Sequence, residues 1–202
     1  MWIGLLVLLA AGLEVPIIAR VSSGEHKSSD ETIWVRYLEM YTPAAEPAEA
    51  PMADLDLELH AEPDIDAYRL LYRKVGDPWR WQARRRLGHQ ELQEVIDHPA
   101  NDLWIVTVAG KAAGFAELDY RKPTEVEIVY FGLTMDWVGR GLGSWLMLSV
   151  LERAWSRPVS RVWLHTCELD HPGAVGFYRR CGFSIFREAR GKCPDPRAKL
   201  WW

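Results

Sequence analysis

The sequence predicts an α/β fold, in which one domain holds a mixed, mostly antiparallel twisted sheet flanked by about four helices. Three observations carry this prediction. The chain has 202 residues, which is enough for one domain with a sizeable core and too few for two comfortable ones. Its 49% hydrophobic and 26% charged residues are typical of a globular chain and exclude a disordered, collagen-like or polytopic membrane protein. The order of the patterned segments, a hairpin followed by strand–helix–strand–helix–strand, indicates a mixed sheet.

The net charge and the cysteine content limit which partners and which cellular compartment we expect for the protein. The net charge of -4 at pH 7 argues against a nucleic-acid partner, because such proteins usually carry a basic surplus. Three cysteines without a disulfide pattern suit a reducing compartment, so we expect a cytoplasmic protein. Eleven tryptophans are the unusual feature, since large aromatic side chains serve packing, a pocket or an interface.

Residues 1–31 form an apolar N-terminal segment followed by a polar linker. Residues 2–13 are apolar without a break, and residues 15–19 resume the run after Glu14. A membrane anchor or a secretory signal is one interpretation, but the run is short for a transmembrane helix and no Lys or Arg precedes it. We therefore favour an appended segment, expect no membrane partner, and assign the domain to residues 32–202.

The domain begins with two strands and two helices. Residues 33–40 are rich in β-branched and aromatic side chains, which favours a strand, and residues 42–51 form a Pro/Ala/Glu linker. Residues 54–60 alternate apolar and polar side chains, as a strand does. Helical spacing then predicts helices over residues 67–75 and 90–96, ended by Gly76 and Pro99 respectively.

The second half alternates strands and helices. Residues 103–108 and 113–120 flank an Ala-Gly-Lys turn and predict a β-hairpin. The remaining predicted elements are a near-continuous apolar strand, a helix, a strand rich in β-branched residues, a helix ended by Gly182 and a last strand. They cover, in that order, residues 126–133, 141–155, 161–167, 173–180 and 183–186.

A glycine-rich loop carries the strongest chemical signal. Residues 139–144 read Gly-Arg-Gly-Leu-Gly-Ser and connect a predicted buried strand to a helix. Glycines allow close backbone approach, and the unpaired N–H groups at a helix N-terminus attract phosphate. Arg140 adds a guanidinium that binds phosphate oxygens. The loop matches neither a Walker A motif nor a dinucleotide fingerprint. A tight turn that needs left-handed residues is the alternative interpretation.

A second motif follows the next strand. Residues 171–183 read His-Pro-Gly-Ala-Val-Gly-Phe-Tyr-Arg-Arg-Cys-Gly-Phe. Together with the glycine loop, it resembles the GNAT superfamily of N-acetyltransferases over roughly residues 54–190. The resemblance implies a single GNAT-like domain, acetyl-CoA as co-substrate, no metal, and an amine on a small molecule or protein as acceptor. A homodimer is a possible assembly of such a domain.

The resemblance also implies which residues bind acetyl-CoA. The strand end is expected to contact the pantetheine arm and the acetyl carbonyl, and the glycine loop the pyrophosphate. Val138 stands where the family has Gln or Arg, and His171 where it has Asn, which puts the contact at position 171 in doubt. The expected binding residues are Leu133, Thr134, Met135, Val138, Gly139, Arg140, Gly141, Leu142, Gly143, Ser144, His171 and Phe177.

Catalytic roles follow from the same resemblance. Glu127 precedes Gly141 by fourteen positions, the distance at which histone-type members carry a strand glutamate, and is the expected base. It could instead simply meet solvent, and Glu117 on the neighbouring strand is the reserve candidate. Tyr178 is the expected acid for the leaving thiolate, with a core aromatic as the alternative. A non-catalytic acetyl-CoA-binding or protein-interaction module is the rival function.

The acceptor wall is expected in residues 72–87, which the first two helices and their connection supply in this fold. Trp79 and Trp81 could line a pocket for a cation. A Trp-rich hydrophobic seam beside an exposed basic stretch, residues 84–86, explains the same residues equally well.

Overall fold

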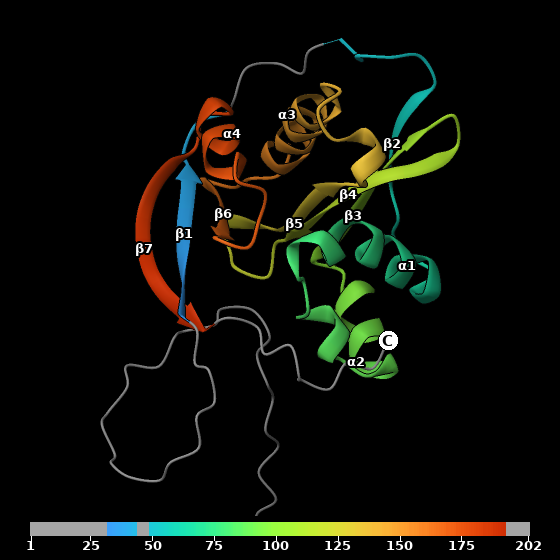
Figure 1. The fold of residues 1–202 in the computed structure, drawn as a ribbon, viewed down its shortest axis with the longest axis horizontal. Coiled ribbons are helices and arrows are strands. Elements are labelled where there is room, and N and C mark those ends of the chain that lie inside the picture. The colour runs from blue at the N-terminus through green and yellow to red at the C-terminus, as the bar shows by residue number, and fades with distance from the viewer. Residues whose placement is uncertain (1–31, 44–48, 193–202) are drawn as a thin grey trace, which may run out of the picture.

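One twisted sheet runs through the computed structural model of the chain, which describes residues 32–43 and 49–192 (Figure 1). In this part of the chain the sheet has seven strands in the order β2-β3-β4-β5-β6-β1-β7. All pairs are antiparallel except β5 with β6. The strands are β1 Thr32–Met40, β2 Leu55–Leu59, β3 Asn101–Val108, β4 Lys111–Asp119, β5 Glu125–Leu133, β6 Arg161–Cys167 and β7 Ser184–Lys192. The predicted α/β fold with a mixed sheet is confirmed.

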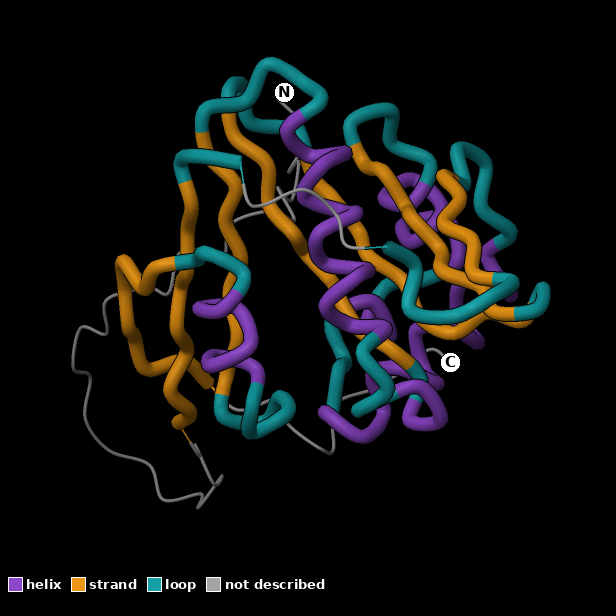
Figure 2. Tube along the Cα trace, turned by 90° about the horizontal axis from the view of Figure 1, so that it is seen from above, coloured by secondary structure: helices purple, strands orange, loops and turns teal. Residues whose placement is uncertain are grey.

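The helices cover the two faces of this sheet (Figures 1 and 2). They are α1 Ile65–Gly76, α2 His89–Ile96, α3 Leu142–Trp155 and α4 Ala174–Arg180, with short 3-10 helices η1 Asp77–Trp79, η2 Arg84–Arg86 and η3 Met135–Trp137. α3 and α4 pack on one face over a core that includes Val126 and Ile128 of β5. α1 and α2 pack on the other face against Phe115 and Leu103. The predicted elements are therefore present, with ends shifted by a few residues.

β5 contains a bulge that separates it from β6. Glu117 of β4 lies opposite Tyr130, and Leu118 lies opposite Ile128, so Val129 is an extra residue on β5. A bulge bends its strand and increases the local twist. The parallel ladder between β5 and β6 accordingly ends at the pair of Ile128 and Leu164. Beyond that pair β5 and β6 diverge and are no longer hydrogen-bonded to each other.

The N-terminal strand β1 lies inside the sheet, between β6 and β7, and pairs antiparallel with both. Its Leu38 and Met40 are buried in the same core as Phe183. The sequence predicted a strand at residues 33–40 but gave no place for it. β1 joins β7 to the rest of the sheet, and β7 is longer than the strand predicted at residues 183–186.

Some predictions lie outside the described residues. These are the apolar segment and linker of residues 1–31 and residues 44–48 of the predicted Pro/Ala/Glu linker. Within residues 32–43 and 49–192, no helix is both long and apolar enough to cross a membrane.

Candidate active site

A cavity of about 550 Å³ lies where β5 and β6 diverge. Its walls come from five segments of the chain: the end of β5, the glycine loop, the end of β6 with the loop that follows, α4, and the connection between α1 and α2. Nine of the residues predicted to act in binding or catalysis line it. They are Leu133, Val138, Gly139, Gly141, Gly143, Ser144, His171, Phe177 and Tyr178.

The glycine loop leaves the N-terminus of α3 open to this cavity. Gly139 and Gly141 have φ angles of 79° and 82°, which glycine adopts without the steric cost that other residues bear. A Cβ added at either position would meet nothing within 4 Å, so the turn, and not crowding inside the protein, requires glycine. No side chain caps this helix start. The tight turn thus leaves backbone N–H groups at the start of α3 without a side-chain partner, an arrangement that can bind an anion.

The other four residues predicted to bind acetyl-CoA lie in the glycine loop or directly after β5. The Arg140 guanidinium lies over the Trp137 ring, 5.3 Å from its centroid, and Leu142 is fully buried in the core. The Thr134 backbone N–H donates to the carbonyl of Ala113 at 2.8 Å. Met135 is exposed. Arg140, Leu142, Thr134 and Met135 do not line the cavity.

α4 brings two aromatic side chains to the cavity. The Phe177 ring stacks on Phe131 with centroids 5.8 Å apart, and the Tyr178 ring meets Phe183 edge-on at 6.2 Å. Tyr178 thus packs in the core and also lines the cavity. Burial, helped by nearby Asp170, raises the pKa of Tyr178. Its phenol therefore holds its proton at neutral pH, as an acid must before it donates.

His171, at the doubtful position, faces the opposite wall. Its Nδ1 accepts a hydrogen bond from the Gly173 N–H at 3.0 Å. Its ring meets Trp79 edge-on with centroids 5.4 Å apart. The contact shows that the loop before α4 and the connection after α1 close one rim of the cavity together.

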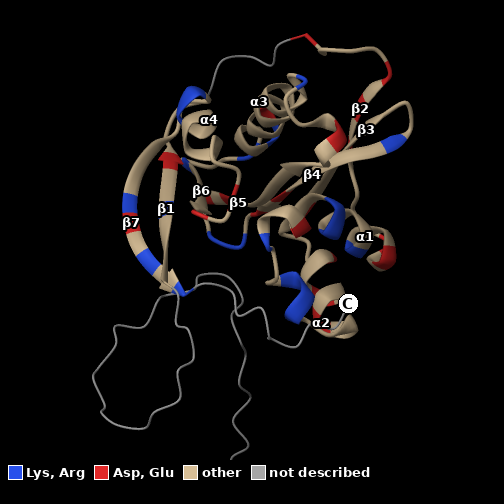
Figure 3. Cartoon of the chain, in the orientation of Figure 1, with Lys and Arg blue, Asp and Glu red and all other residues tan. Residues whose placement is uncertain are grey.

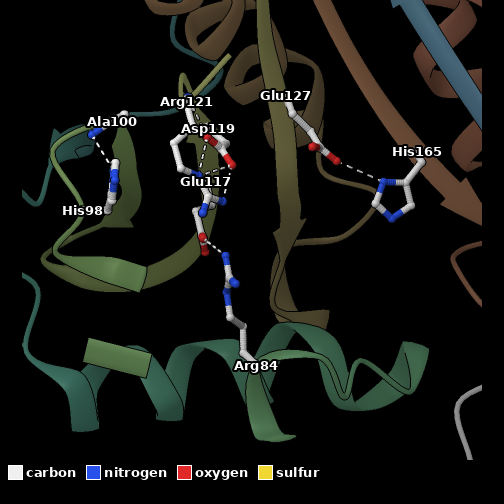
Figure 4. Close-up of polar contacts among 8 residues, drawn as sticks. All are labelled: Arg84, His98, Ala100, Glu117, Asp119, Arg121, Glu127 and His165. Carbon is white, nitrogen blue, oxygen red and sulfur yellow. Dashed lines mark hydrogen bonds and ion pairs between the residues drawn. The ribbon is translucent and has the colours of Figure 1, made fainter. Parts of the chain in front are cut away.

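Glu127 reaches the cavity through another side chain. Its Oε1 lies 3.2 Å from Nδ1 of His165 on β6 (Figure 4). His165 lines the cavity and Glu127 does not. The Glu127 side chain is largely buried, so it does not simply meet solvent. Neighbouring Glu125 instead pairs with Arg161.

Glu117, the reserve candidate, is 0% exposed and has both oxygens engaged. Oε2 accepts from the Tyr68 hydroxyl at 2.8 Å, and Oε1 forms an ion pair with the Arg84 guanidinium (Figure 4). Burial would lower the pKa of Arg84, but Glu117 holds it well above its ordinary value. The interpretation of residues 84–86 as an exposed basic stretch is wrong for Arg84, which is 6% exposed, because a buried carboxylate pairs with it. Basic residues do gather along the α1–α2 connection (Figure 3).

The predicted acceptor wall does face the cavity. Trp81 donates from Nε1 to Asp170 Oδ1 at 3.2 Å, and its ring lies 5.0 Å from that of Tyr130. Gly76 makes this placement possible, since a Cβ there would lie 2.6 Å from the Trp81 ring. Tyr72 and Trp79 line the same wall. The aromatic seam and the pocket wall are therefore the same residues.

Sequence reasoning gave no role to Asp170 or His165. Asp170 Oδ2 accepts from the Thr166 hydroxyl at 2.7 Å and from the Cys167 N–H at 2.9 Å. Its only sequence signal is its place between a strand and the start of a helix motif. His165 carries no sequence signal of a role, because a lone histidine in a strand usually packs. Within the described residues no cluster of His, Cys, Asp or Glu could hold a metal.

Comparisons with known proteins agree with this geometry. Residues 66–183 match the sequence model of the Acetyltransferase (GNAT) family. A mycothiol acetyltransferase of Acidothermus cellulolyticus is 34% identical over 82 residues, which are 41% of this chain and 24% of that protein. The chain thus spans about a quarter of the length of that curated relative.

Two solved structures share the fold. A GCN5-related N-acetyltransferase from Sphaerobacter thermophilus superposes with a TM-score of 0.61 at 16% identity, over 80% of this chain and 52% of that one. An acetyltransferase of Bacillus subtilis, solved in complex with CoA, gives a TM-score of 0.50 at 20% identity, over 64% of this chain and 76% of that one.

Proposed function

The chain belongs to the GNAT acetyltransferase family, and on that basis we propose that it transfers the acetyl group of acetyl-CoA to a primary amine by direct attack within a ternary complex. One observation carries the proposal. The cavity joins an open helix N-terminus and α4 on one face of the sheet to an aromatic wall on the other. Two substrates that enter from opposite faces would meet where β5 and β6 diverge.

Acetyl-CoA fits the α3 and α4 side of the cavity. The glycine loop supplies uncapped N–H groups for the pyrophosphate, and the helix dipole adds to the attraction. Leu133, at the end of β5, is the expected contact of the pantetheine arm and lines the cavity. Tyr178, which stays protonated, would donate its proton to the departing thiolate. We expect the cytoplasm as location, where this co-substrate is present.

The amine requires a base on the α1 side. An alkyl ammonium has a pKa of about 10 and must lose a proton before it attacks. Of the two predicted bases, Glu117 accepts a hydrogen bond and an ion pair in full burial. That engagement supports Glu127, which lies beside a residue of the cavity wall.

We infer a small molecule as acceptor. The whole cavity has a volume of about 550 Å³, within the range of small-molecule sites, about 300–1,000 Å³. The acetyl end of acetyl-CoA would take part of that volume, so the part left for the acceptor suits a small amine. Tyr72, Trp79 and Trp81 offer apolar surface for the body of the acceptor, and the carboxylate of Asp170, from the loop after β6, accepts a hydrogen bond from Trp81 beside them. Aromatic faces next to a carboxylate suit a cationic amine.

Calorimetric titration with acetyl-CoA and a free-thiol assay over a panel of amines test the proposal together. We expect binding, and thiol release with at least one small amine. Tyr178→Phe should lower turnover and leave the affinity for acetyl-CoA nearly unchanged. Binding without thiol release for any amine would support the rival interpretation, a non-catalytic module, and absence of binding would exclude both.

A further inference from the structure

We propose that His165 is the general base that deprotonates the amine, and that Glu127 is its positioning residue. The proposal rests on the proposed function and names a catalytic group within the same site. It moves the proton-accepting atom from the carboxylate of β5 to the imidazole of β6. Three features of the structure carry it: the face on which the pair lies, its exposure and its hydrogen bond.

The pair lies on the face of the sheet that holds the acceptor wall. Residues on neighbouring parallel strands at the same register share a face, and side chains alternate along each strand. Glu127 lies beside Trp163, so His165, two residues on, shares its face. Tyr130 packs with the core under α1, while Val126 and Ile128 pack under α3. The base would therefore approach the substrate from the amine side.

Exposure separates the roles of the two side chains. The His165 side chain is 45% exposed and that of Glu127 is 13% exposed. His165 lines the cavity, whereas Glu127 lies behind it. A group that takes a proton directly must reach the substrate within hydrogen-bond distance, or through one water. Of the two, only His165 faces the cavity where the substrate would lie, and Glu127 would act through it.

The hydrogen bond fixes which nitrogen of His165 carries the proton. An ionised carboxylate only accepts hydrogen bonds, so Nδ1 at 3.2 Å from Glu127 Oε1 must be the donor. In the neutral imidazole, Nε2 then holds the lone pair. Figure 4 shows this nitrogen on the side of the ring turned away from the carboxylate. Glu127 thus presents the basic nitrogen and stabilises the imidazolium that forms.

Several titratable or charged groups surround Glu127 and His165, and their charges affect how the activity of this pair depends on pH. Glu127 comes from β5, and the Tyr37 ring of β1 lies 5.9 Å from the His165 ring. The Arg187 guanidinium of β7 lies over that tyrosine, 5.0 Å from its centroid. The other charged and titratable side chains that line the cavity are Tyr72, Arg80, Tyr130, Cys167, Asp170, His171, Tyr178 and Arg180.

The proton and the bonds balance as follows. The ammonium gives one proton to Nε2 of His165, which passes it to solvent. The amine lone pair forms the C–N bond at the acetyl carbonyl carbon, and the C–S bond breaks. The thiolate takes a proton from Tyr178, which is restored by the proton that the new amide nitrogen loses. Ammonium and thioester thus give amide, thiol and one proton in solution.

The test compares His165→Gln, Glu127→Gln and the control His89→Gln on α2, an exposed histidine away from the cavity. The readouts are the pH profile of kcat/KM for an active amine, the affinity for acetyl-CoA and the unfolding midpoint. His165→Gln should lower kcat/KM about 10²- to 10⁴-fold and remove the acidic limb of the profile, with acetyl-CoA affinity unchanged. Glu127→Gln should cost less and leave the acidic limb in place, because the imidazole that takes the proton is still present and loses only the carboxylate that orients it.

The opposite pattern overturns the proposal. If Glu127→Gln removes the limb while His165→Gln keeps the wild-type profile, the carboxylate is the base. A wild-type protein that releases no thiol with any amine refutes the transferase proposal, and the role of His165 with it. Wild-type turnover with unchanged His165→Gln turnover refutes only the role of His165.

Discussion

Replacing Arg84 with methionine should lower the free energy of unfolding by about 3–5 kcal/mol. Arg84 and Glu117 are 6% and 0% exposed, and without the guanidinium the carboxylate keeps only the hydrogen bond from Tyr68. Two unit charges about 4 Å apart attract by about 4 kcal/mol at an effective dielectric constant near 20, which agrees with that range. Glu117→Gln should cost a similar amount, because it leaves the guanidinium buried without its counter-charge.

A double replacement separates the ion pair from general damage to packing. Arg84→Met combined with Glu117→Leu should recover most of the stability, because no buried charge is left to desolvate. The exposed pair of Arg73 and Asp77 at the end of α1 is the matched control, and Arg73→Met should cost less than about 1 kcal/mol. Denaturant unfolding followed by tryptophan fluorescence gives the midpoint and slope for each variant.

The reasoning fails if either single replacement costs less than about 1 kcal/mol, the range of an exposed pair. It fails in a more instructive way if Glu117→Gln keeps the stability and abolishes turnover, since Glu117 would then be the catalytic base. The structure argues for a positional role, because η2 lies at the end of the predicted acceptor wall, residues 72–87. The Arg84 N–H also donates to the Tyr72 hydroxyl at 3.4 Å, so the buried pair anchors that wall to β4.

Three further predictions concern the loop, the acceptor wall and alkaline pH. Gly141→Ala should weaken acetyl-CoA binding in calorimetry, whereas Gly110→Ala, also at a positive φ but in a hairpin turn, should cost about 1–2 kcal/mol of stability and no affinity. Trp81→Phe loses its hydrogen bond to the β6–α4 loop and should raise KM for the amine with little change for acetyl-CoA. Burial raises the pKa of Tyr68 and of Tyr178, so the unfolded chain ionises first and unfolding midpoints should fall as pH rises above about 10.

Each of these has a contrary result. Equal loss of acetyl-CoA affinity in both glycine variants would mean that the loop acts through stability alone. An unchanged amine KM in Trp81→Phe would remove the α1–α2 connection from the acceptor site. Midpoints that stay level between pH 9 and pH 11 would show that the buried tyrosines titrate alike in the folded and unfolded chain.

The elements and the glycine loop could be predicted because their signals are local. Alternation, helical spacing and turn residues are read within ten or so positions. The place of β1 could not be predicted, because its partners on β6 and β7 lie near the other end of the chain. Arg84 was missed for a related reason. Three successive arginines indicate a solvated stretch, and only the fold brings a buried carboxylate to the first of them.

The candidate site was predicted in two unequal halves. Its α3 and α4 side carries motifs, since binding through backbone N–H groups demands glycine at fixed positions. The amine side carries none, because aromatic side chains occur in any core and single carboxylates occur on any surface. In the structure the α3 and α4 side and the amine side of the site meet in one cavity, and one residue on β5 brings them together.

That residue is Val129, and the bulge there changes which side chains share a face. Strict alternation from Glu127 would place Phe131 with it on the α1 face and Tyr130 on the α3 face. The extra residue reverses this, so Tyr130 packs under α1 and Phe131 packs under α3. The same bend ends the pairing with β6 and opens the cavity. A one-residue irregularity inside an apolar run thus sets both the aromatic wall for the amine and the gap through which it would meet the thioester.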